Sequence, residues 1–162
     1  CHIKNHLKFV SNSFEHLTRK EKRLARVIAL QAIYAHEVAE TDPENAITTI
    51  VEELEGSPSA DVIGYGEKLA CLAIDHQEDS DELIVTRLRN WEMKRVSLID
   101  KLILRLEISE MLHEESVPPK VSIVEGVEIA KLFSTDDSSR FVNGILDSVY
   151  NDSLKGLIKF EK

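Results

Sequence analysis

The segment between residues 94 and 114 limits the possible folds of this chain more than any other. At 100° per residue, its apolar side chains surround a helix on nearly every side, so other helices must enclose it. Arg105 lies within this run, which predicts a structural ion pair with Asp100 or Glu128. The apolar positions are Val96, Leu98, Ile99, Leu102, Ile103, Leu104, Leu106, Ile108, Met111 and Leu112.

The rest of the chain carries repeated signals for helix starts and stops. Thr18 and Glu21 have the spacing of a capping box and predict a helix over about 19–40. Proline after Thr41-Asp42 predicts a second helix through residue 55. No alternating strand pattern is present, so the sequence predicts an all-α protein of about seven helices. The other predicted helices cover about 59–77, a segment capped at Asp79, a segment from a capping box at Ser122 to Phe133, and one from Asp136 or Asp137 to about 151.

Charge is distributed unevenly along the 162 residues. The net charge is −9, which argues against generic nucleic-acid binding, yet residues 1–26 hold seven basic and two acidic side chains. A basic N-terminal segment followed by an acidic remainder of the chain favours a local site for a polyanion and a separate surface for a basic partner. The alternative is an ordinary solvated N-terminus.

The first predicted helix carries a basic face. Arg19, Lys22, Arg23 and Arg26 fall within an arc of about 100° on the helix. Cations on one face near a helix N-terminus are well placed to hold phosphates. Tyr34 lies about three turns further and is placed to stack on an unpaired base if a strand follows the helix. Half burial is the alternative for this tyrosine.

The last predicted helix contains Asn143-Gly144 within its apolar run. A glycine there costs about 1 kcal/mol relative to alanine, so it normally has a local reason. The reason that we expect is the close approach of another backbone.

Signals for catalysis, metal binding and membrane insertion are weak. Asp75, His76 and Asp79 contain ligand types, but no second histidine follows at helical spacing, so neither a metal nor a cofactor is expected. Gly-rich phosphate loops and nucleophile motifs are missing, which predicts a non-enzymatic protein. Two cysteines are too few for a disulfide framework, and no secretory leader or membrane span is recognisable. We therefore expect a cytoplasmic protein.

Four segments in a fixed order resemble the NusB family of bacterial transcription antitermination factors. They are Arg26-Val-Ile-Ala-Leu-Gln-Ala-Ile-Tyr34, Ile103–Met111, Val121–Lys131 and Phe141-Val-Asn-Gly-Ile-Leu-Asp147. The resemblance covers about residues 19–150 and implies two small helical bundles that are perpendicular to one another. The implied organisation is an N-terminal extension (1–17), two helical subdomains (18–78 and 79–151) and a tail (152–162).

The resemblance also implies a function. Family members bind the single-stranded boxA element of ribosomal RNA leader transcripts with NusE, a small-subunit ribosomal protein, and join the antitermination complex on RNA polymerase. A homodimer is the alternative assembly of the free protein. The residues implied in RNA binding are Arg19, Lys22, Arg23, Arg26 and Tyr34 in the first helix and Asp137, Ser138, Arg140 and Phe141 in the last. The alternatives are helix capping for Asp137 and core packing for Phe141.

Acidic side chains along the central helix suggest a surface for the basic partner. Glu107, Glu110 and Glu114 lie in one stretch and are predicted to face NusE, with an ordinary solvated face as the alternative. The chain departs from the family pattern at several positions, including Glu107, Ser109 and an N-terminal segment of about seventeen residues. The competing interpretation is a protein-only helical adaptor of the same fold with little RNA affinity.

Overall fold

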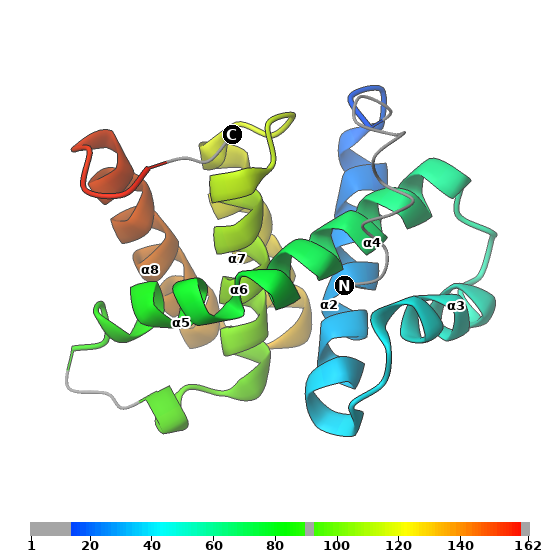
Figure 1. Cartoon of the computed structure of the whole chain (residues 1–162), viewed down its shortest axis with the longest axis horizontal. Coiled ribbons are helices and arrows are strands. Elements are labelled where there is room, and N and C mark those ends of the chain that lie inside the picture. Colours follow the sequence, from blue (N-terminus) through cyan, green and yellow to red (C-terminus); the bar gives the residue numbers. More distant parts are fainter. Residues whose placement is uncertain (1–13, 90–92, 160–162) are drawn as a thin grey trace. The chain divides into compact units, whose positions relative to one another are not determined.

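The computed structural model describes residues 14–89 and 93–159, which contain seven α-helices, one short 3₁₀ helix and no strand (Figure 1). The prediction of an all-α protein with about seven helices is confirmed. The elements are α2 (Arg19–Ala39), α3 (Pro43–Glu53), α4 (Ala60–Asp75), α5 (Gln77–Val85), η1 (Met93–Arg95), α6 (Leu98–His113), α7 (Pro119–Phe133) and α8 (Asp136–Leu154).

The chain divides into two compact units, with the division between Asp75 and His76. The N-terminal unit holds α2, α3 and α4, and the C-terminal unit holds α5 to α8. The division falls three residues before the predicted boundary at 78/79, because α4 ends at Asp75 and His76 already precedes α5.

In the N-terminal unit, α2 packs against both α3 and α4. Gly66 allows the close approach of α4 to α2, because a Cβ atom there would lie 3.1 Å from the carbonyl oxygen of Ala25. The Tyr65 ring is fully buried and packs against Phe14 with ring centroids 5.5 Å apart. Contacts of this kind hold α2 firmly, which fixes the direction of the side chains that it carries.

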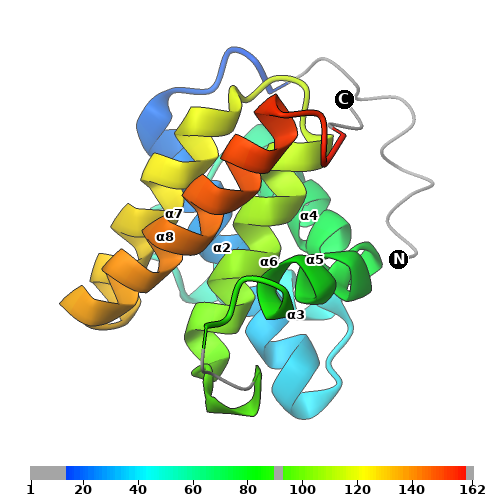
Figure 2. The same ribbon diagram turned by 90° about the vertical axis from the view of Figure 1, so that its left-hand side faces the viewer.

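In the C-terminal unit, α6 packs against α5, α7 and α8. Every residue from Leu102 to Leu112 is buried, so the central enclosed helix predicted from the sequence is present. Figure 2 shows α7 and α8 running side by side, with α5 next to α6. The helix begins later than predicted, at Leu98, because the Ser97 side chain caps it by accepting from the backbone N–H of Asp100 at 3.2 Å.

Three predicted helix starts were wrong. Helix α5 begins at Gln77, so Asp79 lies within its first turn, and α7 begins at Pro119, whose fixed φ suits a first helical position. Ser122 is therefore buried inside α7, where its hydroxyl donates to Glu110 Oε1 at 2.8 Å. Helix α8 is capped by Thr135, rather than by either predicted aspartate. The capping box of α2 and the cap before Pro43 are confirmed.

The predicted ion-pair partners of Arg105 were also wrong. Its Nε and Nη2 atoms each donate to a carboxylate oxygen of Asp81 on α5, both at 2.7 Å. This bidentate pair joins α5 to α6, and only 9% of the Arg105 side chain is exposed. Sequence spacing within a helix does not reveal a partner 24 residues away.

Candidate nucleic-acid interface

The start of α2 is fixed by a reciprocal pair of hydrogen bonds. The backbone N–H of Thr18 donates to Glu21 Oε2 at 2.7 Å, and the N–H of Glu21 donates to Thr18 Oγ1 at 3.2 Å. The hydrogen bonds from the Thr18 backbone and side chain lower the pKa of Glu21. This capping arrangement is therefore favoured with the carboxylate ionised, and it sets the first turn from which the basic side chains project.

The cations of α2 differ in how much of each reaches the surface. Arg19 is exposed, Lys22 and Arg23 are half-buried, and Arg26 is only 1% exposed. Arg26 shares its face of the helix with Leu30 and Ile33, which are buried one and two turns later. The predicted basic face therefore ends at Arg23. Tyr34, on the other hand, is 42% exposed and presents an aromatic surface.

The start of α8 is tied to α6 through Ser138. The Ser138 hydroxyl donates to Asp100 Oδ2 at 2.9 Å and accepts from the Ser134 hydroxyl at 2.7 Å. Arg140 and Asp137 form a loose pair at 3.6 Å on the surface, where such pairs contribute little to stability. Both side chains thus stay accessible to a ligand.

A hollow of about 340 Å³ lies beside this helix start. Three of the four residues predicted in α8 line it, namely Asp137, Ser138 and Phe141. Asp100 contributes a buried Oδ1 atom that has no hydrogen-bond partner within residues 14–89 and 93–159. Carboxylate, hydroxyl and aromatic groups together suit the recognition of an unpaired base by its edge and face. Sequence reasoning missed Asp100 and Arg95, the cation at the rim, because both precede α8 by a long stretch of chain.

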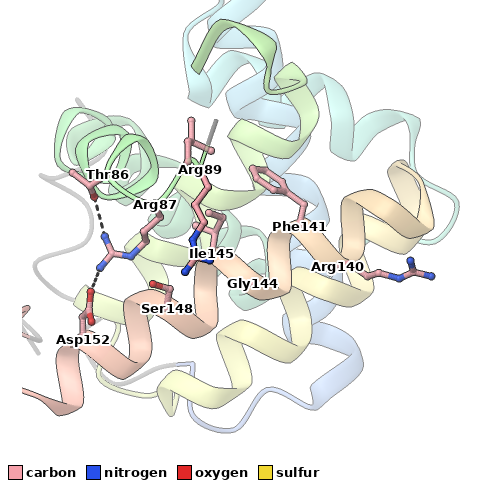
Figure 3. A pocket seen from close by; sticks show the side chains of 10 residues that line it. Thr86, Arg87, Arg89, Arg140, Phe141, Gly144, Ile145, Ser148 and Asp152 are labelled. Carbon is pink, nitrogen blue, oxygen red and sulfur yellow. Dashed lines mark hydrogen bonds and ion pairs between the residues drawn. The ribbon is translucent and has the colours of Figure 1, made fainter. Parts of the chain in front are cut away.

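A second, larger hollow of about 620 Å³ lies between the end of α5 and α8 (Figure 3). Phe141 lines this groove as well as the first hollow, so the two cavities share a wall. Arg140 and Gly144 line it from α8, and Arg87 and Arg89 line it from the turn after α5. No sequence pattern marked these two arginines as part of a site, since they lie far from both predicted groups of residues.

The predicted acidic partner surface was wrong. Glu107 and Glu110 have no exposed surface, and Glu114 is 3% exposed. Glu107 and Glu110 lie on the enclosed helix α6, and Glu114 is its C-cap. Glu110 accepts from the Ser122 hydroxyl, and Glu114 Oε1 accepts from the Ser116 hydroxyl at 2.7 Å. Residues without exposed area cannot provide a docking face. The apolar residues that surround these glutamates in the sequence already indicated that they would be buried.

The acidic and histidine residues at the end of α4 do not form a set of metal ligands in the described part of the chain. Within the described ranges, no group of three or more His, Cys, Asp or Glu side chains is arranged to hold a metal ion. The His76 ring stacks instead on the His113 ring, with centroids 3.8 Å apart and planes 15° apart. Among the helices of the described residues, none is long and apolar enough to cross a membrane.

Comparison with known proteins identifies the family. The model of the NusB family matches residues 23–151. The chain belongs to the NusB family. The transcription antitermination protein NusB of Symbiobacterium thermophilum is 42% identical over 134 residues, covering 79% of this chain and 88% of the relative. The protein of the same name from Bacillus pumilus is 36% identical over 132 residues, covering 82% and 96%.

Solved structures share the fold of the NusB family. T. maritima NusB has 30% identity and a TM-score of 0.72, covering 81% of this chain and 91% of that chain. A chain in the structure of a plectonemic RNA supercoil has 25% identity and a TM-score of 0.75, covering 85% and 98%. A chain in a complex of NusB and NusE with double-stranded RNA has 24% identity and a TM-score of 0.70, covering 83% and 98%.

The predicted RNA-binding residues divide between the two units. Arg19, Lys22, Arg23, Arg26 and Tyr34 all lie on α2 in the N-terminal unit. The C-terminal unit brings its four predicted residues together over the first two turns of α8. Each group is therefore a local cluster formed by one helix and the elements packed against it.

Proposed function

We propose that this chain is a non-enzymatic transcription antitermination factor that binds boxA-type single-stranded RNA together with NusE. The observation that carries the RNA-binding proposal is the hollow beside Phe141, in which carboxylate, hydroxyl and aromatic groups meet at an exposed helix start. Family membership supports the role in antitermination, since the relatives from S. thermophilum and B. pumilus carry that name. The occurrence of RNA and NusE in structures of the same fold is consistent with both partners.

The cations at the start of α2 that reach the surface supply the electrostatic part of the proposed interface. Arg19, Lys22 and Arg23 would hold phosphates, which fixes the position of a strand without reading its sequence. Tyr34 would stack on a base further along the helix. Arg26 is assigned no phosphate contact here, because its side chain is buried.

The start of α8 supplies the groups that read bases. Phe141 would stack on an unpaired base, and the Asp137 carboxylate would accept hydrogen bonds from a base edge. The Ser138 hydroxyl would exchange its hydrogen bond to Asp100 for one to the base. Arg140, which is 80% exposed, is available for an adjacent phosphate. Single-stranded RNA fits this arrangement better than a duplex, whose bases are paired and stacked.

Assembly is the proposed mode of action. NusE would enlarge the RNA-binding surface, and the resulting complex would join the RNA polymerase antitermination machinery in the cytoplasm. The surface for NusE must use residues other than Glu107, Glu110 and Glu114, which are buried. A homodimer of the free protein is the competing assembly that NusE would have to displace.

Fluorescence anisotropy with a labelled boxA-type RNA tests this function. We expect saturable binding that NusE strengthens and that an Arg19→Ala, Lys22→Ala, Arg23→Ala variant loses by at least about tenfold, since several phosphate contacts disappear together. The matched control removes three exposed lysines from other positions, Lys20, Lys131 and Lys155, and should retain most of the affinity.

Two results would contradict the proposal in different ways. Absence of saturable binding by the folded wild-type chain, with and without NusE, would leave the protein-only adaptor. Equal losses in the α2 variant and its control would show that only overall charge matters, which would remove the assignment of the site to α2.

A further inference from the structure

The groove between α5 and α8 is basic although the chain is acidic. Three arginines and a single carboxylate line it, in a protein with a net charge of −9. Its volume of about 620 Å³ exceeds that of the hollow beside Phe141. A concave surface of one charge sign attracts ligands of the opposite charge, here an anion.

The arginines of the groove have different surroundings. Arg87 is held in place, since its Nη1 atom donates to the Leu83 carbonyl oxygen at 3.0 Å and its Nη2 atom pairs with Asp152. Arg89 is exposed and has no ion pair or hydrogen bond within the described part of the chain. Its side chain reaches toward α8 near Ile145, whereas Arg140 points away from the other two arginines (Figure 3). Arg89 is thus the cation available inside the groove.

Gly144 forms part of the groove wall and has no packing reason to be glycine. A Cβ atom at this position would meet no described atom within 4 Å. The residue lies in the interior of α8, where glycine is less favourable than alanine. The expected close approach of another backbone is therefore absent among residues 14–89 and 93–159, and we infer that an external ligand needs this space.

We propose that the α5–α8 groove holds the sugar-phosphate backbone of the RNA strand whose unpaired base occupies the hollow beside Phe141. This inference rests on the proposed function and extends it to residues outside the predicted site. Arg89 donates to a phosphate oxygen, Gly144 lets the backbone lie directly on α8, and Ser148 offers a hydroxyl to the ribose. Phe141 lines both cavities, so a strand can pass from one to the other without leaving the protein.

Charge favours RNA over the protein partner as the occupant of this groove. NusE, as a ribosomal protein, is expected to be basic, and a basic surface against Arg87, Arg89 and Arg140 would be repelled. An RNA backbone carries one negative charge per nucleotide and complements the same side chains. The lack of a side chain at Gly144 also suits a flexible backbone that needs room.

Two variants test the groove, each by anisotropy with a boxA-type RNA across a series of salt concentrations. Arg89→Ala should weaken binding about three- to tenfold and should lower the magnitude of the salt slope by roughly one phosphate contact. In Gly144→Leu, the leucine side chain should occupy the groove and weaken RNA binding at least about three- to tenfold. The helix should still form, because leucine has a high helix propensity. Lys155→Ala, which removes an exposed cation after the same helix, and Asn143→Ala, at the exposed neighbour of Gly144, are the controls.

The outcomes separate this inference from the function on which it rests. If the wild-type chain binds RNA and both groove variants bind it equally well, the groove proposal fails and the function stands. If the variants lose affinity for NusE but keep their affinity for RNA, the groove is a protein contact and the proposal is overturned. If the folded wild-type chain binds no RNA, the proposed function itself fails. Loss of RNA affinity in Arg89→Ala and Gly144→Leu, with both controls unchanged and with unchanged circular dichroism, supports the groove.

Discussion

Two glycines in the C-terminal unit lie in contrasting surroundings. At Gly126 in α7, a Cβ atom would lie 2.8 Å from Leu146 Cδ1 and 3.0 Å from Glu107 Cγ. At Gly144 in α8, a Cβ atom would meet no described atom within 4 Å. Gly126 is buried, while Gly144 is exposed on the wall of the groove. The first glycine is required by packing among α6, α7 and α8, and the second is not.

The difference distinguishes a structural from a functional explanation for the same residue type. Both glycines interrupt a helix at a cost of about 1 kcal/mol relative to alanine. Around Gly126, the close packing of three helices offsets this cost. Around Gly144 no contact among the described residues offsets this cost, which is the pattern expected where a binding surface departs from maximal stability.

Gly126→Ala is expected to give the largest change in stability. Overpacking of a tight core costs about 1–3 kcal/mol, and the better helix propensity of alanine offsets about 1 kcal/mol of this cost. The free energy of unfolding should therefore fall by up to about 2 kcal/mol. Leu146 has no exposed surface and therefore little room to move away. Urea denaturation followed by circular dichroism measures the change.

The clash with Leu146 can be isolated by a double variant. Leu146→Val removes the Cδ1 atom that lies nearest to the added methyl group. The double variant Gly126→Ala, Leu146→Val should then be more stable than the sum of the two single changes indicates, by about 0.5 kcal/mol or more. If the two changes in stability simply add, the contact with Leu146 is not the reason for glycine at position 126. The proposed difference between Gly126 and Gly144 would then be contradicted.

Gly144→Ala is expected to give a smaller change with the opposite sign. The free energy of unfolding should rise by about 0.5–1 kcal/mol, because alanine forms helix better and meets no obstacle. The same methyl group narrows the groove, so affinity for RNA should fall by a factor of about two to five, or roughly 0.4–1 kcal/mol. Denaturation and anisotropy on one preparation measure both effects. A destabilised variant would point to a packing role for this glycine after all.

The amino-acid sequence predicted the fold well because the fold depends on periodic patterns. The apolar run from Leu102 to Leu112 has only one reasonable environment, the centre of a helical bundle. Helix starts were predicted correctly at Thr18 and Asp42 but not at Ser122, which has capping-box spacing and yet lies inside α7. A local signal of this kind fails where proline at the first helical position defines an earlier start.

The candidate site was predicted less completely, since its members come together only in three dimensions. Asp137, Ser138 and Phe141 were proposed together because they lie at the start of one predicted helix, whereas Asp100 lines the same hollow from another helix. Arg105 similarly pairs with Asp81, which no spacing rule within α6 can reveal. Arg26 and the glutamates at 107, 110 and 114 show the reverse error, in which charged residues assigned to the surface are buried.

The salt dependence of RNA binding by the wild-type chain, with NusE present, tests the central claim most directly. If Arg19, Lys22 and Arg23 on α2 and Arg89 in the groove act as proposed, they would form about three to four phosphate contacts. Affinity should then fall roughly 15- to 60-fold between 50 and 200 mM salt for a single strand. Saturable binding with that slope is the predicted result. Binding that changes by less than about twofold over this range, or no saturable binding of the folded protein, would contradict the account.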